Sequence, residues 1–84
     1  MPTTEEIRDA IEQALPEARV AVEDTTGAGD HFEVEVRTPA FAGRSLVEQH
    51  QLVYRALGDA MHGEIHALAL KTYTPQTWAK VSGG

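Results

Sequence analysis

The sequence predicts an α+β domain in which helices cover one face of a three-stranded mixed sheet. Two patterns favour this class: helical periodicity near the start and in the middle of the chain, and three shorter segments in which apolar and polar residues alternate. A chain of 84 residues also supports one small core rather than two. The expected order is α-β-β-α-(α)-β-α, in a single domain over residues 1–80 with a flexible tail over 81–84.

The first helix is expected to begin after Thr3. Thr3 and Glu6 have the spacing of a capping box, in which each side chain bonds the backbone N–H of the other residue. Apolar residues then recur at helical intervals, at Ile7, Ala10, Ile11, Ala14 and Leu15. Pro16 ends the helix, because the residue before a proline avoids helical geometry.

Residues 18–24 and 31–37 are expected to form a hairpin. In the second segment, HFEVEVR, three apolar residues alternate with three charged ones, so one face packs on helices and the other meets water. The connection TTGAGD carries two glycines that suit a turn. A backbone nest for anions is the alternative reading of this loop, although no lysine follows it.

A second helix is expected to open at Ser45, which has capping-box spacing to Glu48. Before it, Pro39 leaves the sheet and Phe41 is expected to plug the core. The apolar stripe of the helix is predicted at Leu46, His50, Val53, Leu57 and Met61. His50 is therefore expected to be a core or boundary histidine rather than a ligand. A short helix over residues 59–62 is the optional element.

The third strand is predicted over residues 64–72, parallel to the first strand. Alternation places His66 on the same face as Leu68 and Leu70, at the opening end of the strand. A partly sheltered His66 with one ring nitrogen available is one interpretation, and a buried histidine bonded to a backbone carbonyl is the other. Thr74 then caps a last helix with Pro75 in its first turn, and Trp78 is expected to cover the core.

Composition restricts the chemistry. The chain has no cysteine, so it holds no disulfide and offers no thiolate of its own to a metal. Its formal net charge of −6, with seven scattered lysines and arginines, argues against broad phosphate binding. No apolar run approaches the ~20 residues of a membrane span, and the acidic N-terminus lacks an apolar h-region, so no secretory signal is expected. These features predict a cytoplasmic protein without a membrane partner.

The element order matches the type II KH-like fold, and the residues also resemble the BolA-like family. The resemblance rests on FAGRS over residues 41–45, VEQHQLVYRAL over 47–57, IHALALKTYTP over 65–75, and Trp78. A further segment, TGAGDHFEVEV over 26–36, is similar to the short-loop form of the family's first hairpin.

The resemblance implies an adaptor that pairs with a monothiol glutaredoxin and acts in iron–sulfur trafficking or iron and redox regulation. A [2Fe-2S] cluster bridges such pairs: the glutaredoxin cysteine and a glutathione supply thiolates, and the family's C-terminal histidine falls on His66. Family members with a second ligand carry His or Cys inside the hairpin loop, where this chain has neither. His31, at the end of the loop, is the candidate second ligand, and Asp30 is a weaker one. The isolated chain is expected to bind no cluster and to be a monomer or weak homodimer.

Two other functions are considered. A nucleic-acid-binding transcriptional regulator would use Arg44 and Arg55 for phosphates, although FAGRS lacks the GxxG clamp of KH domains. An enzyme would need Ser45 as nucleophile, or an acid–base group from Asp24, Asp30, His31 and His66. Ser45 is already explained as a helix cap, so the chain is not expected to be an enzyme.

Overall fold

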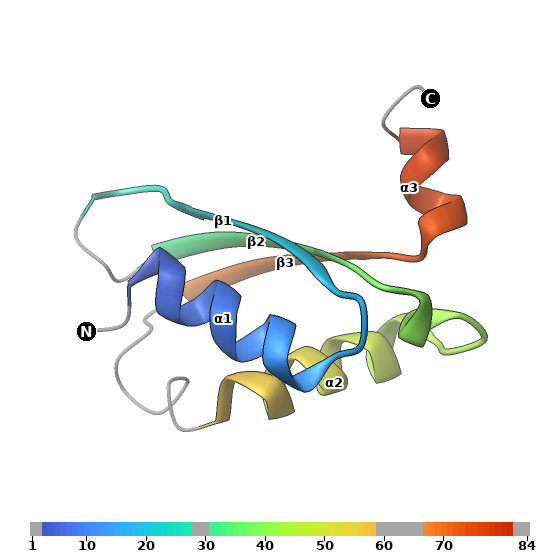
Figure 1. The fold of residues 1–84 in the computed structure, drawn as a ribbon. Coiled ribbons are helices and arrows are strands. Elements are labelled where there is room, and N and C mark those ends of the chain that lie inside the picture. Colours follow the sequence, from blue (N-terminus) through green and yellow to red (C-terminus); the bar gives the residue numbers. More distant parts are fainter. Residues whose placement is uncertain (1–2, 28–30, 59–66, 82–84) are drawn as a thin grey trace.

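The computed structural model describes residues 3–27, 31–58 and 67–81 (Figure 1). The elements in this part of the chain are α1 (Thr4–Ala14), β1 (Arg19–Asp24), β2 (His31–Arg37), a 3-10 turn η1 (Pro39–Phe41), α2 (Leu46–Leu57), β3 (Ala67–Tyr73) and α3 (Pro75–Val81). The predicted order is confirmed for these elements. The optional helix over 59–62 and the start of the predicted third strand lie outside the described residues.

The three strands form one mixed sheet with β2 in the centre. β1 pairs antiparallel with β2, with Arg19 opposite Arg37 and Asp24 opposite Phe32. β3 pairs parallel with β2, and its first residue, Ala67, lies opposite His31. The prediction that the third strand runs parallel to the first is wrong. A helical crossover joins strands of the same direction, and here it leads from β2 to β3.

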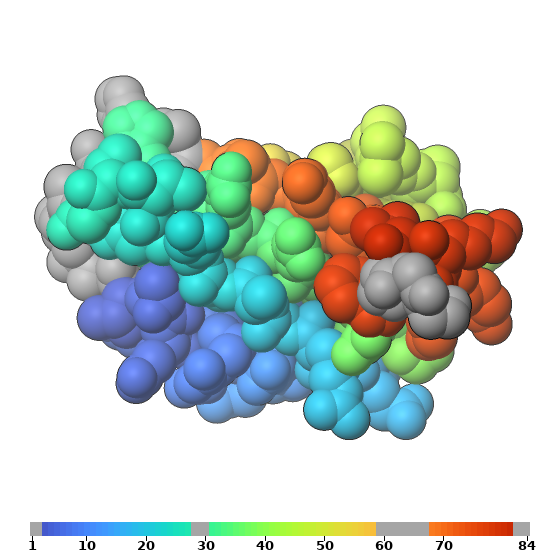
Figure 2. Space-filling view, turned by 90° about the horizontal axis from the view of Figure 1, so that it is seen from above, coloured from blue at the N-terminus to red at the C-terminus, as the bar shows by residue number. Residues whose placement is uncertain are grey.

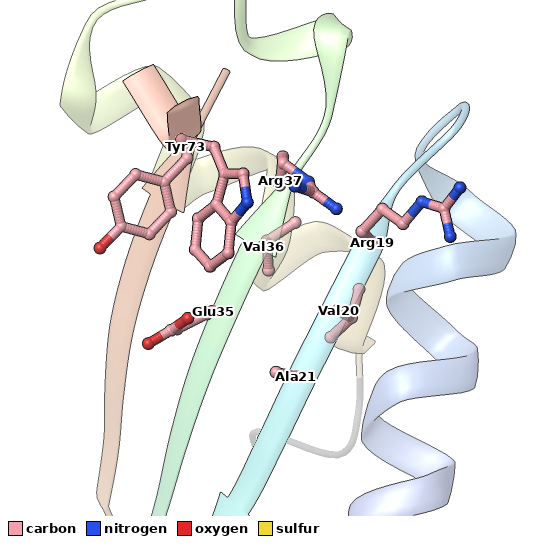
Figure 3. A pocket seen from close by; sticks show the side chains of 8 residues that line it. Arg19, Val20, Ala21, Glu35, Val36, Arg37 and Tyr73 are labelled. Carbon is pink, nitrogen blue, oxygen red and sulfur yellow. The ribbon is translucent and has the colours of Figure 1, made fainter. Parts of the chain in front are cut away.

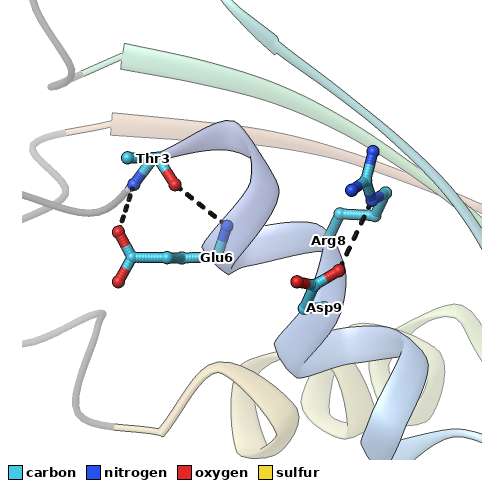
Figure 4. Close-up of polar contacts among 4 residues, drawn as sticks. All are labelled: Thr3, Glu6, Arg8 and Asp9. Atoms are coloured by element: carbon cyan, nitrogen blue, oxygen red, sulfur yellow. Dashed lines mark hydrogen bonds and ion pairs between the residues drawn. The ribbon is translucent and has the colours of Figure 1, made fainter.

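α1 begins with the predicted capping box (Figure 4). The Glu6 N–H donates to Thr3 Oγ1 at 3.1 Å, and the Thr3 N–H donates to Glu6 Oε1 at 3.1 Å. Arg8 and Asp9 form an ion pair at 3.6 Å on the exposed side of this helix, where such a pair contributes little. Its apolar side buries Ile7 and Ile11 against the sheet.

The core lies between the sheet and the two longer helices, α1 and α2, which cover one face as predicted (Figure 1). Phe41, on the turn after β2, is fully buried, which confirms that it plugs the core. Leu68 and Leu70 of β3 pack against the same cluster from their predicted face. The buried apolar residues in the described part of the chain are Ile7, Ile11, Leu15, Phe32, Val34, Val36, Phe41, Val53 and Leu57.

Thr38 is a buried polar residue that periodicity does not reveal. It is 0% exposed, and its hydroxyl donates to the carbonyl of Pro16 at 2.6 Å. The same oxygen accepts from the Ala40 N–H at 3.1 Å. Thr38 therefore ties the end of β2 to the segment that follows α1.

α2 also begins with its predicted capping box, between Ser45 and Glu48. The Ser45 backbone N–H donates to Glu48 Oε1 at 2.9 Å. This bond, then a hydrogen bond from the Ser45 side chain and the nearby charge of Arg44, lower the pKa of Glu48 below its ordinary value although desolvation opposes them. Gly58 ends the helix with φ +55°.

The apolar stripe of α2 is shorter than predicted. Val53 and Leu57 are buried, but Leu46 is 62% exposed because it stands at the first helical position, beyond the edge of the core. His50 is half-buried, as expected of a boundary histidine. Met61 lies outside the described residues. Gln49 contributes a contact that the stripe does not predict: its amide N–H donates to the Arg44 carbonyl at 3.0 Å, and its oxygen accepts from Thr72 at 2.6 Å.

α3 stands at one end of the sheet, on the side opposite α1 and α2 (Figure 1). Trp78 therefore does not cover the core. Its ring instead lies against Arg37 and Tyr73 on the outer face of the sheet. The outer face is otherwise open, and all three strands reach the surface there (Figure 2).

Candidate functional site

His31 lies where the hairpin loop enters β2. Its backbone carbonyl accepts hydrogen bonds from the Thr25 N–H at 3.0 Å and from the Thr25 hydroxyl at 3.2 Å. These two bonds close the base of the loop directly beside the histidine. The backbone position of His31 is therefore fixed by the sheet on one side and by Thr25 on the other.

The side chain of His31 follows the outward phase of β2, as predicted from alternation with the buried Phe32. It is half-buried rather than exposed, and its Nδ1 is buried. An imidazole in such a place is more restricted in orientation than one at an open strand edge. His31 is therefore not a fully solvated histidine.

His66, the principal predicted ligand, lies outside the described residues. The register nevertheless gives a local reference point, because Ala67 follows His66 in the sequence and pairs with His31. β2 and β3 are parallel, so the starts of both strands lie at the same end of the sheet. His31 and the first residue of β3 therefore lie at one end of the sheet.

The first part of the hairpin loop is shaped by Asp24. Its Oδ1 accepts from the Gly27 N–H at 2.9 Å and from the Thr26 N–H at 3.3 Å, and Gly27 has φ +79°. These contacts support the reading of the loop as a turn. Asp30 and the rest of the GAGD segment lie outside the described residues.

The donor set present does not fit a cluster held by this chain alone. Within residues 3–27, 31–58 and 67–81, no group of three or more His, Asp or Glu side chains is close enough to hold a metal ion. The sequence has no cysteine, whereas iron–sulfur clusters need thiolates. The residues fit a cluster only if a second molecule supplies the sulfur ligands.

The two candidate phosphate contacts are not brought together. Arg44 precedes α2 and Arg55 lies in its last turn, and both are exposed. From Leu46 to Arg55 the helix rises about 13 Å, at roughly 1.5 Å per residue. The two arginines therefore do not form a single phosphate site.

A second feature was missed by the sequence analysis. On the outer face, the Arg37 guanidinium carbon lies 4.9 Å from the centre of the Trp78 ring, and Tyr73 meets that ring edge-on at 5.2 Å. Beside them lies a hollow of about 140 Å³ (Figure 3). The register of the expected hairpin, counted outward from its loop, would have placed Arg19 opposite Arg37.

The element order and the mixed sheet define a type II KH-like α+β domain. Comparison with known proteins then gives its family. The family described as BolA-like protein matches residues 2–77, so the chain belongs to the BolA-like family.

Individual relatives agree with this assignment. Protein BOLA2 of Arabidopsis thaliana is 40% identical over 80 residues, covering 93% of this chain and 85% of the relative. The DNA-binding transcriptional regulator BolA of Vibrio cholerae is 36% identical over 87 residues, covering 90% and 82%. The solved structure of a bolA protein homologue from Coxiella burnetii is 47% identical and superposes with a TM-score of 0.78, covering 93% of this chain and 97% of that one.

None of the helices in the described residues combines the length and the apolar character that crossing a membrane requires.

Proposed function

We propose that this BolA-like chain is an adaptor that pairs with a monothiol glutaredoxin and contributes histidine to a bridging, glutathione-dependent [2Fe-2S] cluster. The observation that carries the proposal is the parallel register of β2 and β3, in which His31 faces the residue that follows His66. The sequence places His66 directly before that residue, so the proposal puts both predicted ligands at one end of the sheet. Membership of the BolA-like family supports the same role.

The chemistry of the chain agrees with a shared cluster. Without cysteine it offers imidazole, and its partner and glutathione would offer the thiolates. Imidazole in place of thiolate on one iron raises the reduction potential, as in Rieske-type centres. A cluster with one firm ligand from this chain would be more labile and easier to transfer, which suits cluster transfer or iron sensing rather than catalysis. We therefore propose an adaptor and not an enzyme.

The two histidines have different expected roles. From the sequence pattern, His66 is predicted to share the strand parity of Leu68 and Leu70, whereas His31 has the outward parity of Glu33. Side chains of opposite parity diverge along a strand, so they reach one metal only at a strand end where the alternation stops. We propose His66 as the principal ligand and His31 as the second, weaker one.

The test uses the visible absorption and circular dichroism of the assembled complex. An iron-loaded monothiol glutaredoxin with glutathione is mixed with the wild-type chain, with His66→Ala and with His31→Ala. We expect His66→Ala to abolish the spectral change and His31→Ala to weaken it and speed loss of the cluster. His50→Ala is the matched control, because His50 lies on α2 and away from the start of β2. An unaltered spectrum with His66→Ala would remove that residue from the coordination sphere.

A second function, DNA binding, is favoured by one observation, the name of the Vibrio cholerae relative. In this chain it would rely on Arg44 and Arg55 as separate phosphate contacts. Retention on duplex DNA at ~150 mM salt, reduced by Arg44→Ala, is the expected result if this function exists. The absence of retention at that salt concentration would exclude DNA binding, and the adaptor role would be the one remaining proposal.

A further inference from the structure

The hollow beside Trp78 lies on the outer face of the sheet, far from His31. It is lined by residues of β1, β2 and β3 together with Trp78 of α3 (Figure 3). Ala21 is the smallest side chain of its lining and leaves room above β1, while Trp78 and Tyr73 form an aromatic wall. His31 and Arg37 are the first and last residues of β2, about 20 Å apart at roughly 3.3 Å per residue.

Arg19 and Arg37 are among the residues that line this hollow; the Arg37 guanidinium lies beside Trp78, whereas the Arg19 guanidinium points away from that ring (Figure 3). Arg19 and Arg37 are directly opposed strand partners, and like charges in that position destabilise a sheet. In the part of the chain that the structure describes, neither has a carboxylate within 4.0 Å. Arg37 is held in place by Trp78, so its guanidinium is oriented before any ligand arrives. An anionic group that both side chains can reach would offset the repulsion between them.

The size of the hollow limits what enters it. About 140 Å³ is well below the roughly 300–1,000 Å³ of sites that enclose a whole small-molecule ligand. It accommodates one apolar side chain, and the rest of the ligand must lie outside, along the open face (Figure 2). The occupant is therefore a part of a larger molecule.

The charge around the hollow distinguishes a carboxylate from a phosphate chain. Glu35 also lines the hollow, and Glu23 and Glu33 are opposed partners further along the same outer face. A nucleic-acid strand carries a phosphate at every nucleotide and would meet these carboxylates. A single carboxylate needs only the two arginines, which bind such groups with paired N–H donors.

We propose that this hollow binds the C-terminal residue of a partner polypeptide that ends in an apolar side chain. The carboxylate and the side chain of a terminal residue leave from the same Cα, so one can reach Arg19 and Arg37 while the other fills the space above Ala21. Successive residues within an extended chain point to opposite sides, so an internal acidic residue beside an apolar one does not offer the pair together. The proposal does not depend on the cluster-binding role of the other end.

The test uses Trp78, the only tryptophan in the sequence, as a fluorescent reporter. The full chain is titrated with the peptide acetyl-Gly-Gly-Leu carrying a free carboxylate, and with its C-terminal amide. We expect the acid peptide to cause a saturable change in Trp78 fluorescence. The amide peptide should bind with about tenfold lower affinity, the loss typical of one charge-assisted hydrogen bond. Arg19→Gln is expected to weaken binding of the acid peptide by a similar factor, so that the acid and amide peptides bind with equal affinity.

A matched pair of variants tests whether the hollow binds the apolar side chain of the peptide. Ala21→Leu fills the hollow and is expected to abolish binding, whereas Ala69→Leu makes the same change on the same face outside it and is expected to leave binding intact. Far-ultraviolet circular dichroism confirms that each variant is folded. Three results would each overturn the proposal. The wild-type chain could bind the acid and amide peptides with equal affinity, the Ala21→Leu variant could bind the acid peptide as well as the wild-type chain does, or neither Trp78 fluorescence nor backbone amide NMR could show a saturable response. A saturable response to single-stranded oligothymidylate, titrated instead of the peptide, would also overturn it.

Discussion

The two ends of β2 carry different chemistry on one outward row of side chains. At the start of the strand, His31 stands beside a turn closed by Thr25, and its outward neighbour is acidic. At the other end, Arg37 lies against an aromatic ring in a hollow of defined shape. Both ends share one core on the opposite face. The comparison shows how a small domain offers two separate surfaces when its helices cover only one side of a sheet.

Breaking the shared core is expected to have the largest effect, and to affect both ends equally. Phe41→Ala removes a fully buried ring and should lower the free energy of unfolding by about 3–5 kcal/mol, a large part of the roughly 5–15 kcal/mol of a typical domain. Urea unfolding is followed by Trp78 fluorescence and by the His31 ring signals in NMR. Two distinct midpoints would show that the ends unfold independently.

Thr38→Val is expected to rank second, and it acts at the Arg37 end. Valine keeps the shape but leaves the Pro16 carbonyl without its donor and the Ala40 N–H without its acceptor. Losing these two part-buried hydrogen bonds should cost about 1–3 kcal/mol. Thermal unfolding measures the loss, and Thr38→Ser serves as the control that retains the hydroxyl. Equal stability of the valine and serine variants would contradict the role given to these bonds.

Trp78→Ala should sharpen the comparison by altering one end only. Loss of its contacts with Arg37 and Tyr73 is expected to cost roughly 1 kcal/mol. The amide NMR shifts of β2 should change near Arg37 and remain unchanged near His31. Val81→Ala, an exposed change on the same helix, is the control. Shifts that spread to His31 would mean that the two ends are coupled.

The smallest expected effect is on the pH dependence of stability, and it should not distinguish the two ends of β2. Because the pKa of Glu48 is lower in the folded chain than in the unfolded one, its contribution to stability is present above the ordinary carboxyl value and is lost as the pH falls through the lower folded value. Glu48→Gln should therefore flatten part of the fall in stability as the pH drops below the ordinary carboxyl pKa of 4.5. Glu5→Gln, also in the first turn of a helix but outside a capping box, is the control. An unchanged slope in Glu48→Gln would exclude this linkage.

Much of the fold follows from local patterns in the sequence. The capping boxes at Thr3 and Ser45 mark both helix starts correctly, because they depend on residues three positions apart. Alternation in β2 gives the correct inner and outer faces. Leu46 shows the limit of periodicity, since an apolar residue in phase is buried only where another element covers it.

The candidate site was predictable in part. The outward phase of His31 follows from the sequence, but its half-buried state does not, because alternation separates the two faces of a strand and says nothing of what covers the outer one. The position of Trp78 was predicted wrongly, because nothing local indicates on which side of the sheet α3 stands. Thr38 and the hollow arise from contacts between segments distant in sequence, and these have no periodic signature.

The pair of bonds from Thr25 to the carbonyl of His31 has an evolutionary consequence. Residues between these two positions can be inserted or removed while every β1–β2 pair keeps its partner. For a flexible segment, doubling the length costs only about 0.6 kcal/mol. Descendants of this chain can therefore acquire new side chains at that rim by simple lengthening, at no expense to the hydrophobic interior.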